Sequence, residues 1–319
     1  PDGSVDWTLT VPGSGNTEFA QLAQDPDSGD LFAVGRSWPS EGVTDVFVVR
    51  ISEQGELIWE REFREPGTQQ ASSVAVIPGD GLVLAGMTIP LTDGPGNPEG
   101  LILRLDADGN ELWRYQTSSL DHTSFSAVAV HADGAVSVAG VAYSDFAGRN
   151  AGLSDVLLMT FDAEGGLLWQ TQFGGEGEDS PVRMAVTEDS DLIVVGHTFS
   201  AESAQDVFLA RYSATGEQVS LQTFGGNDSD RALALSLAGE TVFVAAVMAR
   251  YEGADGPVVK SVSLNVLVDG RVLPAVPEVS FDGAIGGAVI LVNDAGLASL
   301  LLSVNSGPGW RLMSVPAPA

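Results

Sequence analysis

The chain has 319 residues and a formal net charge of −29, with 43 acidic side chains against 14 basic ones. A field this negative repels phosphate backbones and anionic lipid headgroups, so it excludes nucleic acid as a partner and disfavours the membrane surface. The chain has no cysteine, which excludes disulfide bonds and thiol catalysis.

The apolar content indicates a folded domain rather than a disordered or membrane-spanning chain. Hydrophobic residues make up 44% of the sequence and are spread along it, which is enough for a large core. The longest apolar run, Ala284 to Val292, is too short to cross a bilayer, so we expect no membrane insertion. No charged-then-apolar leader opens the chain, and Pro1 is interpreted as the start of a mature or trimmed product. The single lysine fits a GC-rich genome and a saline habitat equally well.

A sequence motif recurs along the chain at intervals of about fifty residues. It consists of an apolar strand, a short acidic or polar turn containing glycine, and a strand that carries tryptophan. Its copies are Asp45–Trp59, Leu101–Trp113, Asp155–Trp169 and Asp206–Val219, with Val219 expected where tryptophan stands in the others. A repeat of this period indicates one supersecondary unit that is copied and stacked.

Each unit contains four strand signals separated by turn residues. In the second unit they are Ser72–Ile77, Leu82–Thr88, Leu101–Leu105 and Glu111–Thr117. Strands such as Val46–Val49 are apolar on both faces, which requires sheets that are covered on both sides. Helical periodicity is absent, so the pattern predicts an all-β chain of four-stranded antiparallel blades, a β-propeller.

We expect one domain of six blades. Seven blades are the alternative, because the last units no longer carry the sequence motif of the repeat. The ring is expected to close with an N-terminal strand that completes the last blade, which leaves no free sheet edge. Trp7 supports this closure, since it precedes Trp59 by the repeat period. The expected blades are residues 17–63, 69–117, 123–173, 179–224, 228–279 and 283–315 plus 4–11.

Small and large residues recur at fixed places in the repeat. Glycine ends the second strand at Gly35, Gly86, Gly140 and Gly196, with Ala245 expected in the fifth unit. Trp59, Trp113 and Trp169 lie on the outer strand, where neighbouring blades diverge and a bulky ring can fill the wedge. These indoles are therefore interpreted as core rather than as ligand-stacking groups.

Two motifs carry a family resemblance. Phe173-Gly174-Gly175 and Phe224-Gly225-Gly226, each followed by an acidic turn and an alanine-rich strand, resemble bacterial propeller repeats of the SBBP type. The element from Leu105 to Trp113 is similar to the tryptophan-docked repeats of PQQ-type propellers. The SBBP resemblance implies a secreted or cell-surface, extracytoplasmic protein without an assigned reaction. The vicinal disulfide of PQQ enzymes cannot form here, so a PQQ enzyme is excluded.

Binding residues are expected at one face of the propeller. Tight hairpins such as 52–56 and 162–166 gather at one face, while the longer connections, such as 36–44, 89–100 and 143–154, gather at the other. Long loops on a rigid scaffold are where binding residues usually lie. The candidate ligand-binding residues at this long-loop face are Trp38, His122, Tyr143, Arg149, His197, Arg231, Arg250 and Tyr251.

An enzyme is the alternative, in the form of a carbohydrate-active or lactonase-like hydrolase. Its catalytic residues would be Asp121, His122 and His197, with Asp121 orienting His122 for acid–base work. The competing interpretation of these residues is that they are solvated loop residues. His131 lies in a short turn and is expected to be solvated.

No cofactor is expected, and calcium is the only metal considered. Asp106–Glu111 looks like a fragment of a calcium loop, but its spacing fits a hairpin turn better. The better calcium candidates are the acidic turns that carry Glu178 and Asp179, and Asp228 and Asp230. A solvated acidic turn is favoured over a metal site at both places.

The sequence therefore predicts a secreted or surface-attached, non-enzymatic propeller that acts as a binding, adhesion or scaffold module. Its partner would be a protein or a glycan bound at the long-loop face. The hydrolase and a purely structural spacer without ligand stay open beside it. The patterns do not specify the ligand, the oligomeric state, or whether the chain belongs to a longer protein.

Overall fold

The computed structural model describes most of the chain. The described residues are 6–12, 15–40, 42–91, 96–118, 120–199, 205–225, 229–239, 241–251, 258–268, 271–281, 284–292, 298–305 and 310–316. After Val247, side chains are described only at Ala288 and Ile290. The chain divides into two compact units, one of residues 1–149 and 157–172 and the other of residues 150–156 and 173–319. Each unit is treated by itself below.

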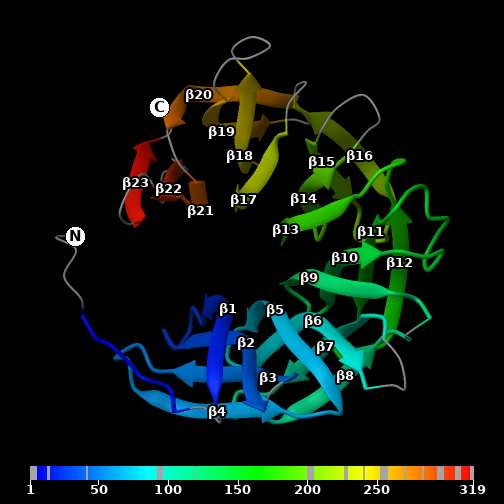
Figure 1. The fold of residues 1–319 in the computed structure, drawn as a ribbon, viewed down its shortest axis with the longest axis vertical. Coiled ribbons are helices and arrows are strands. Elements are labelled where there is room, and N and C mark those ends of the chain that lie inside the picture. The colour runs from blue at the N-terminus through cyan, green and yellow to red at the C-terminus, as the bar shows by residue number, and fades with distance from the viewer. Residues whose placement is uncertain are drawn as a thin grey trace. The chain divides into compact units, whose positions relative to one another are not determined.

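The first unit is built from antiparallel sheets whose strands follow chain order (Figure 1). One sheet comprises β1 (Asn16–Gln24), β2 (Leu31–Ser40), β3 (Val43–Ile51) and β4 (Leu57–Phe63). The next comprises β5 (Gly67–Ile77), β6 (Gly81–Pro90), β7 (Glu99–Leu105) and β8 (Glu111–Gln116). A third comprises β9 (Thr123–Val130), β10 (Val136–Ala142), β11 (Asp155–Phe161) and β12 (Leu167–Phe173). A single parallel bridge between Thr44 and Thr68 links the first two sheets.

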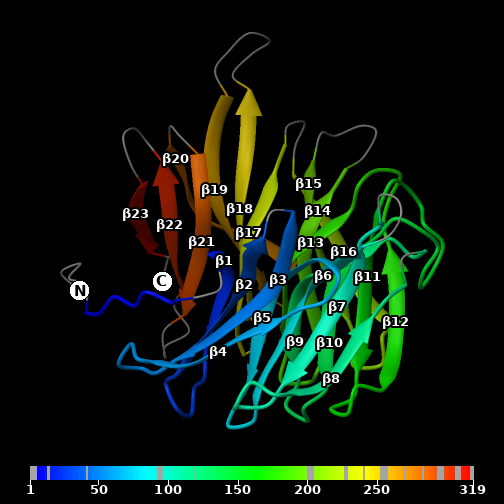
Figure 2. The ribbon, with the colours of Figure 1, turned by 60° about the horizontal axis from the view of Figure 1, so that its bottom comes forward.

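The second unit continues the same pattern. Its first sheet comprises β13 (Ser180–Val186), β14 (Leu192–Thr198), β15 (Asp206–Tyr212) and β16 (Gln218–Phe224). The next comprises β17 (Arg231–Ala238), β18 (Thr241–Tyr251), β19 (Val258–Val268) and β20 (Arg271–Phe281), with β18 and β19 forming a long ribbon (Figure 2). The last comprises β21 (Ala284–Val292), β22 (Ala298–Asn305) and β23 (Trp310–Pro316).

These sheets confirm the prediction of an all-β chain of antiparallel sheets. The third strands whose side chains are described, β3, β7, β11 and β15, are buried along most of their length, as their continuous apolar runs require, and every residue of β7 and β11 is buried. The outer strand β8 instead alternates, with Trp113 and Tyr115 turned inward. No helix in the described part of the chain is long and apolar enough to pass through a bilayer.

The recurring glycine of the second strand faces a bulge in the first strand. In β1 the pairing register shifts at Ala20, and the same shift recurs in β5 at Ser72. The bulge brings a backbone carbonyl against the opposite strand, so a Cβ atom on Gly35 would collide with the Glu18 carbonyl oxygen. Gly86, Gly140 and Gly196 meet the carbonyls of Gln70, Ser124 and Ser180 in the same way. The register places Ala246, rather than the expected Ala245, at this position in the fifth sheet, opposite Ala232.

The tryptophans dock onto the neighbouring sheet, consistent with their interpretation as core residues. The indole Nε1–H of Trp59 donates to the Ala107 carbonyl at 2.9 Å, and Trp113 donates to the Ala163 carbonyl at 2.9 Å. Each ring lies against a turn glycine of positive φ, Gly109 (81°) or Gly165 (88°). A side chain at these glycines would be strained by φ and would also meet the indole. The turn glycine of the repeat therefore serves both the hairpin and the docked ring.

The alignment expected for the fourth copy of the motif differs by one residue from the strand pairing. Arg50 pairs with Trp59 and Arg104 with Trp113, whereas the equivalent Arg211 pairs with Ser220. Ser220, not Val219, therefore stands where tryptophan stands in the other copies. Val219 corresponds to the exposed aliphatic residue that precedes each tryptophan, such as Ile58 (47% exposed).

Two other expectations were wrong in detail. Residues 6–12 form no strand, and the sheet of β21 to β23 has three strands among the described residues, so the N-terminal strand predicted there is not formed. The connection expected over residues 36–44 is mostly strand, because β2 continues to Ser40 and pairs there with Val43 at the start of β3. Ring closure and the number of blades therefore stay predictions.

Replacing Trp59 with phenylalanine should destabilise the protein measurably. The change keeps a ring in the buried site but removes the indole donor to the Ala107 carbonyl, which still accepts from Arg50 Nη1 at 2.8 Å, so the expected loss is about 0.5–1.5 kcal/mol. Urea unfolding followed by circular dichroism would measure it. Trp113→Phe is the matched control, because Trp113 is less buried and the loss there should be smaller; equal stability of Trp59→Phe and the parent chain would contradict the docking role.

Candidate functional site

The antiparallel order gives each sheet two different ends. At one end lie the tight hairpins, such as Ser52–Glu56 and Asp162–Gly166, closed by backbone hydrogen bonds of 2.8 Å. At the other end the second strand turns into the third and the chain passes to the next sheet, as at residues 143–154. We call this second end the long-loop end.

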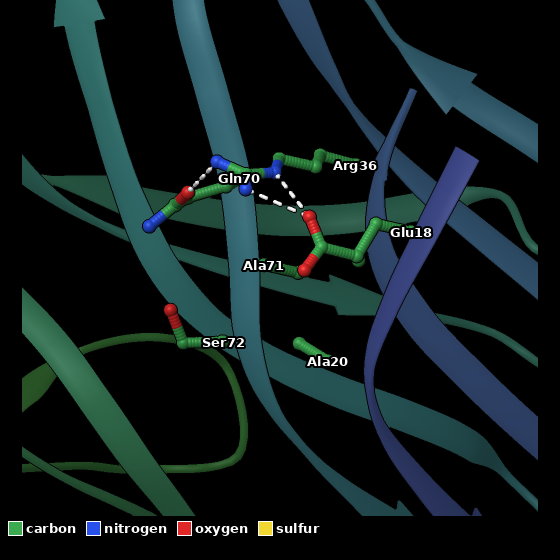
Figure 3. A pocket seen from close by; sticks show the side chains of 7 residues that line it. Glu18, Ala20, Arg36, Gln70, Ala71 and Ser72 are labelled. Atoms are coloured by element: carbon green, nitrogen blue, oxygen red, sulfur yellow. Dashed lines mark hydrogen bonds and ion pairs between the residues drawn. The ribbon is translucent and has the colours of Figure 1, made fainter. Parts of the chain in front are cut away.

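A cavity of about 160 Å³ lies near the long-loop end of the first unit (Figure 3). It is set between the first two strands of one sheet, β1 and β2, and the first strand of the next, β5. The lining residues are Glu18, Ala20, Gly35, Arg36, Gln70, Ala71 and Ser72.

Arg36 is held in place by polar partners on two strands. Its Nε and Nη2 atoms donate to Glu18 Oε2 at 3.0 and 2.7 Å. Its Nη1 donates to Gln70 Oε1 at 3.0 Å. The guanidinium carbon also lies 4.7 Å from the centre of the Trp38 ring, a cation–π contact. Arg36 is thus fixed by an ion pair, an amide and an aromatic ring, and one of these partners belongs to the neighbouring sheet.

The strand bulges shape the cavity. Ala20 and Ser72 are the extra residues in the bulges of β1 and β5, and both line it. A bulge re-aims the side chains around it, and such irregularities are common beside functional sites. Gly35 lets the β1 backbone approach β2 closely beside the cavity, because the Glu18 carbonyl lies where a Cβ atom would be.

The Glu18–Arg36 pair departs from the repeat. Glu18 pairs with Arg36, and the same register position is Gln70 with Met87 in the second sheet and Ser124 with Val141 in the third. The fourth and fifth sheets have Ser180 with His197 and Arg231 with Val247. No other described sheet carries an acid and a base at this place, so the repeat architecture alone does not require the pair.

Of the residues predicted for the long-loop face, Trp38 is the one that supports this cavity, through its contact with Arg36. Sequence reasoning missed Glu18, Arg36, Gln70 and Ser72. Aligning the repeats by strand register would have marked Glu18 and Arg36 as exceptions. Arg149 is exposed, and the side chains of Arg250 and Tyr251 lie outside the described residues.

His122 and Tyr143 form an exposed aromatic pair at the same end of the first unit. Their rings stack with centroids 4.4 Å apart, and Tyr143 is 47% exposed. His122 has a positive φ of 46°, and its carbonyl accepts a hydrogen bond from the Tyr143 backbone N–H at 3.1 Å. The carboxylate of Asp121 accepts from the Ser118 backbone and hydroxyl at 3.0 and 2.9 Å. Asp121 therefore closes its own turn, and the described hydrogen bonds do not join it to His122.

His197 lies in the second unit and is partly buried on β14. Burial lowers its pKa, the nearby Arg231 charge acts in the same direction, and a hydrogen bond to the Ala232 backbone opposes them. A neutral imidazole held against a backbone group is thus the state that the surroundings favour. Arg231 itself is exposed at the start of β17.

The two phenylalanine-glycine-glycine motifs end where pairs of carboxylates meet. A Cβ atom on Gly174 would collide with Asp155 Oδ1 and lie 2.6 Å from Asp179 Oδ2. Asp155 and Asp179 are both buried, at 0% and 3% exposed. Burial raises the pKa of Asp179, and the Asp155 charge adds to this, against hydrogen bonds from Thr198 and Gly175.

The same arrangement recurs one sheet later. A Cβ atom on Gly225 would collide with Asp206 Oδ1 and lie 2.6 Å from the buried Asp230 Oδ2. Asp179 and Asp230, two of the calcium candidates, thus each belong to a separate carboxylate pair. Glu178 is exposed, and Asp228 lies outside the described residues. Among the described side chains, no three or more His, Asp or Glu residues are grouped to hold a metal ion.

His131 is buried rather than solvated, contrary to expectation. It is 7% exposed, its Nε2 lies 2.7 Å from Ser137 Oγ, and Ser137 Oγ lies 2.7 Å from Thr160 Oγ1. Thr160 occupies the third-strand position that Arg50 occupies in the first sheet, where Arg50 pairs with Asp30 at 2.7 Å. The fourth sheet has Arg211 with Asp191 at 2.7 Å. The third sheet thus replaces a strand-to-hairpin ion pair with a chain of hydrogen bonds.

Comparisons with known proteins identify a fold and no family. No protein-family model matches the chain, and no curated protein matches it. It is similar to a subtype N10 neuraminidase-like protein of A/little yellow-shouldered bat/Guatemala/060/2010, with a TM-score of 0.50, 10% identity and 92% of each chain covered. A protein of unknown function from Bacteroides caccae has a TM-score of 0.49 and 13% identity, covering 90% of this chain and 89% of that one. Sqt1 from Chaetomium thermophilum has a TM-score of 0.49 and 11% identity, covering 92% and 84%. Likeness at this identity shows a propeller-like all-β fold alone.

Gly174→Ala should destabilise the protein, because the new methyl group would overlap the converging carboxylates. Overpacking of this kind costs about 1–3 kcal/mol. Gly175→Ala is the matched control, since its Cβ atom would lie 3.9 Å from Asp179 Oδ2, in ordinary contact. Thermal unfolding of both variants would compare them, and an equal shift in Tm would rule out the crowding at Gly174.

His131→Gln should make the protein less sensitive to acid. Burial lowers the pKa of His131 below its ordinary value of 6.5 although Asp133 opposes this, so below about pH 6.5 the unfolded chain takes up a proton that the folded chain does not. Stability is therefore lost as the pH falls below that value, and the variant should lose less between about pH 7 and 5. The free energy of unfolding at several pH values would show this. Parallel curves for the two proteins would contradict a neutral buried His131.

Proposed function

We propose that this chain is a non-enzymatic binding module of a secreted or cell-surface protein, built as a six-bladed propeller that binds its ligand at the long-loop end. The observation that carries the proposal is the Glu18–Arg36–Gln70 group beside the cavity. Its polar atoms are fixed by 2.7–3.0 Å hydrogen bonds, yet the side chains of Arg36 and Glu18 remain 35% and 57% exposed. Polar groups that are fixed but open to solvent are suited to recognition.

The N-terminal segment supports closure of the ring. A Cβ atom on Gly55 would collide with the Trp7 ring, just as the Trp59 and Trp113 rings lie against Gly109 and Gly165. Trp7 thus packs on the first β3–β4 turn as an outer-strand tryptophan packs on the turn of the next sheet. This is the place that the outer strand of a preceding blade would occupy.

The proposed secreted or surface location is supported by the strong acidity of the chain and by the SBBP-type sequence motifs Phe173–Gly175 and Phe224–Gly226. High net charge favours solubility, and it disfavours association with nucleic acid and anionic membranes. A protein or glycan on another surface is therefore the kind of partner that fits.

Binding is favoured over hydrolysis by what the candidate catalytic groups contact. Asp121 bonds to Ser118, His122 stacks on Tyr143, and His197 bonds to the Ala232 backbone. A general acid or base works best when a second group orients it toward the reacting proton. Each of these side chains instead contacts a neighbouring group that is not a second catalytic residue. This supports a structural or recognition role for them rather than a catalytic one.

The labelled chain should bind ligands on arrays of glycans and of extracellular proteins without converting them. Trp38→Leu and Tyr143→Ser, at the long-loop end, should lower the retained signal at least tenfold, since central aromatic contacts carry much of the binding energy. Leu112→Ser is the matched control, because Leu112 is 54% exposed on the outer strand β8.

Mass spectrometry of the bound ligands would test for turnover. Unchanged ligand masses together with loss of binding in the two long-loop variants would support the proposal. Released product, or loss of binding only in Leu112→Ser, would overturn it.

A further inference from the structure

We infer that the cavity between β1, β2 and β5 takes a neutral, hydroxyl-rich ligand, one sugar residue of a glycan. This inference rests on the proposed binding function and names the chemistry of its ligand. The side chains of the lining residues include one carboxylate, one guanidinium, one amide, one hydroxyl and the exposed methyl group of Ala20. Each part of that set restricts what can enter.

The balance of charge excludes ions as the preferred ligand. Glu18 and Arg36 form an ion pair at 2.7 Å, so the charges inside the cavity cancel. An anion would face the Glu18 carboxylate and the −29 charge of the whole chain, while a cation would face the Arg36 guanidinium. A neutral ligand avoids both repulsions.

The hydrogen-bonding groups that remain are of both kinds. Arg36 has five N–H groups, and its described bonds to Glu18 and Gln70 use three of them. Glu18 Oε1 accepts none of the described hydrogen bonds, and Figure 3 shows it turned away from Arg36 on the side of Ala71. Gln70 and Ser72 also line the space, and their side chains carry an amide and a hydroxyl group. Donors beside an acceptor match hydroxyl groups, because each hydroxyl both donates and accepts.

The size and the apolar lining fit one ring. About 160 Å³ is well below the roughly 300–1,000 Å³ of pockets for drug-sized molecules, so a single small ring fills it. Ala20 is exposed and contributes an apolar methyl group to the lining, whereas the side chain of Ala71 is packed in the core. A sugar ring has an apolar C–H face that can lie on the Ala20 methyl while its hydroxyls reach the polar side chains.

Trp38 helps to preorganise the Arg36 side chain for binding. The Arg36 guanidinium lies 4.7 Å from the centre of the Trp38 ring, and Glu18 and Gln70 accept hydrogen bonds from the N–H groups of the guanidinium. A side chain that is already fixed loses little conformational freedom on binding. The site can therefore bind weakly but selectively despite its small area.

The inference is tested by saturation-transfer NMR of the full chain with separate small molecules. The probes are neutral hexoses and N-acetylhexosamines, each free and as the methyl glycoside, with a hexuronate and a hexosamine for comparison. The site variants are Glu18→Gln and Arg36→Met, and each puts in the residue that the second sheet carries at that register position, Gln70 or Met87. The control variants are Glu111→Gln and Arg114→Met, which break an ion pair of 2.6 Å on the outer strand β8.

At least one neutral sugar should show saturation transfer, with affinity at least tenfold weaker in both site variants and unchanged in the control variants. The charged sugars should bind more weakly than the neutral ones. Stronger signals from the glycosides than from the free sugars would identify a glycan, and the reverse a free sugar. Circular dichroism and Tm would verify that the variants fold.

Three outcomes would overturn the inference: no transfer from any neutral sugar, preferred binding of a charged sugar, or binding that the site variants leave unchanged. The proposed function fails separately. If the array ligands still bind and depend on Trp38 and Tyr143 while these sugar tests fail, the binding module stands and only its ligand class is wrong.

Discussion

The close approach of two backbones at the first-strand bulge is the constraint on which the rest of the structure depends. At Gly35 the Glu18 carbonyl lies where a side chain would begin, and the same contact is repeated at Gly86, Gly140 and Gly196. The bulge sets the register of the first two strands and re-aims the side chains beside it. The candidate cavity exists because two such bulges, at Ala20 and Ser72, face one space.

The repeat preserves the place of a contact more strictly than its chemistry. Arg50 with Asp30 and Arg211 with Asp191 tie the third strand to the first hairpin, and Arg104 with Asp80 does the same at 2.6 Å. The third sheet makes the link through His131, Ser137 and Thr160 without a charge pair. In each of these four sheets the polar end of the third-strand side chain has a partner near the first hairpin, although the side chains that supply the contact differ.

The fold was largely predictable from the sequence, and the site was not. Apolar runs such as Val46–Val49 identify strands buried on both faces, and turn glycines such as Gly109 mark the hairpins, because both signals are local. Alignment within the repeat was less secure, since Val219 and Ser220 differ by one position that only strand pairing resolves. Glu18, Arg36 and Gln70 are far apart in the chain and meet through cross-strand pairing and the neighbouring sheet. No spacing rule connects them, so they could be recognised only after the register was known.

The docked tryptophans Trp59 and Trp113 make the first two sheets depend on the sheets that follow them. Trp59 and Trp113 anchor to backbone carbonyls some fifty residues ahead, whereas Ser220 has no indole to extend. In stacked architectures, stability is the sum of what each unit contributes and what each junction adds. The junction after the fourth sheet lacks this contact, so we expect it to open locally more readily than a junction that has one.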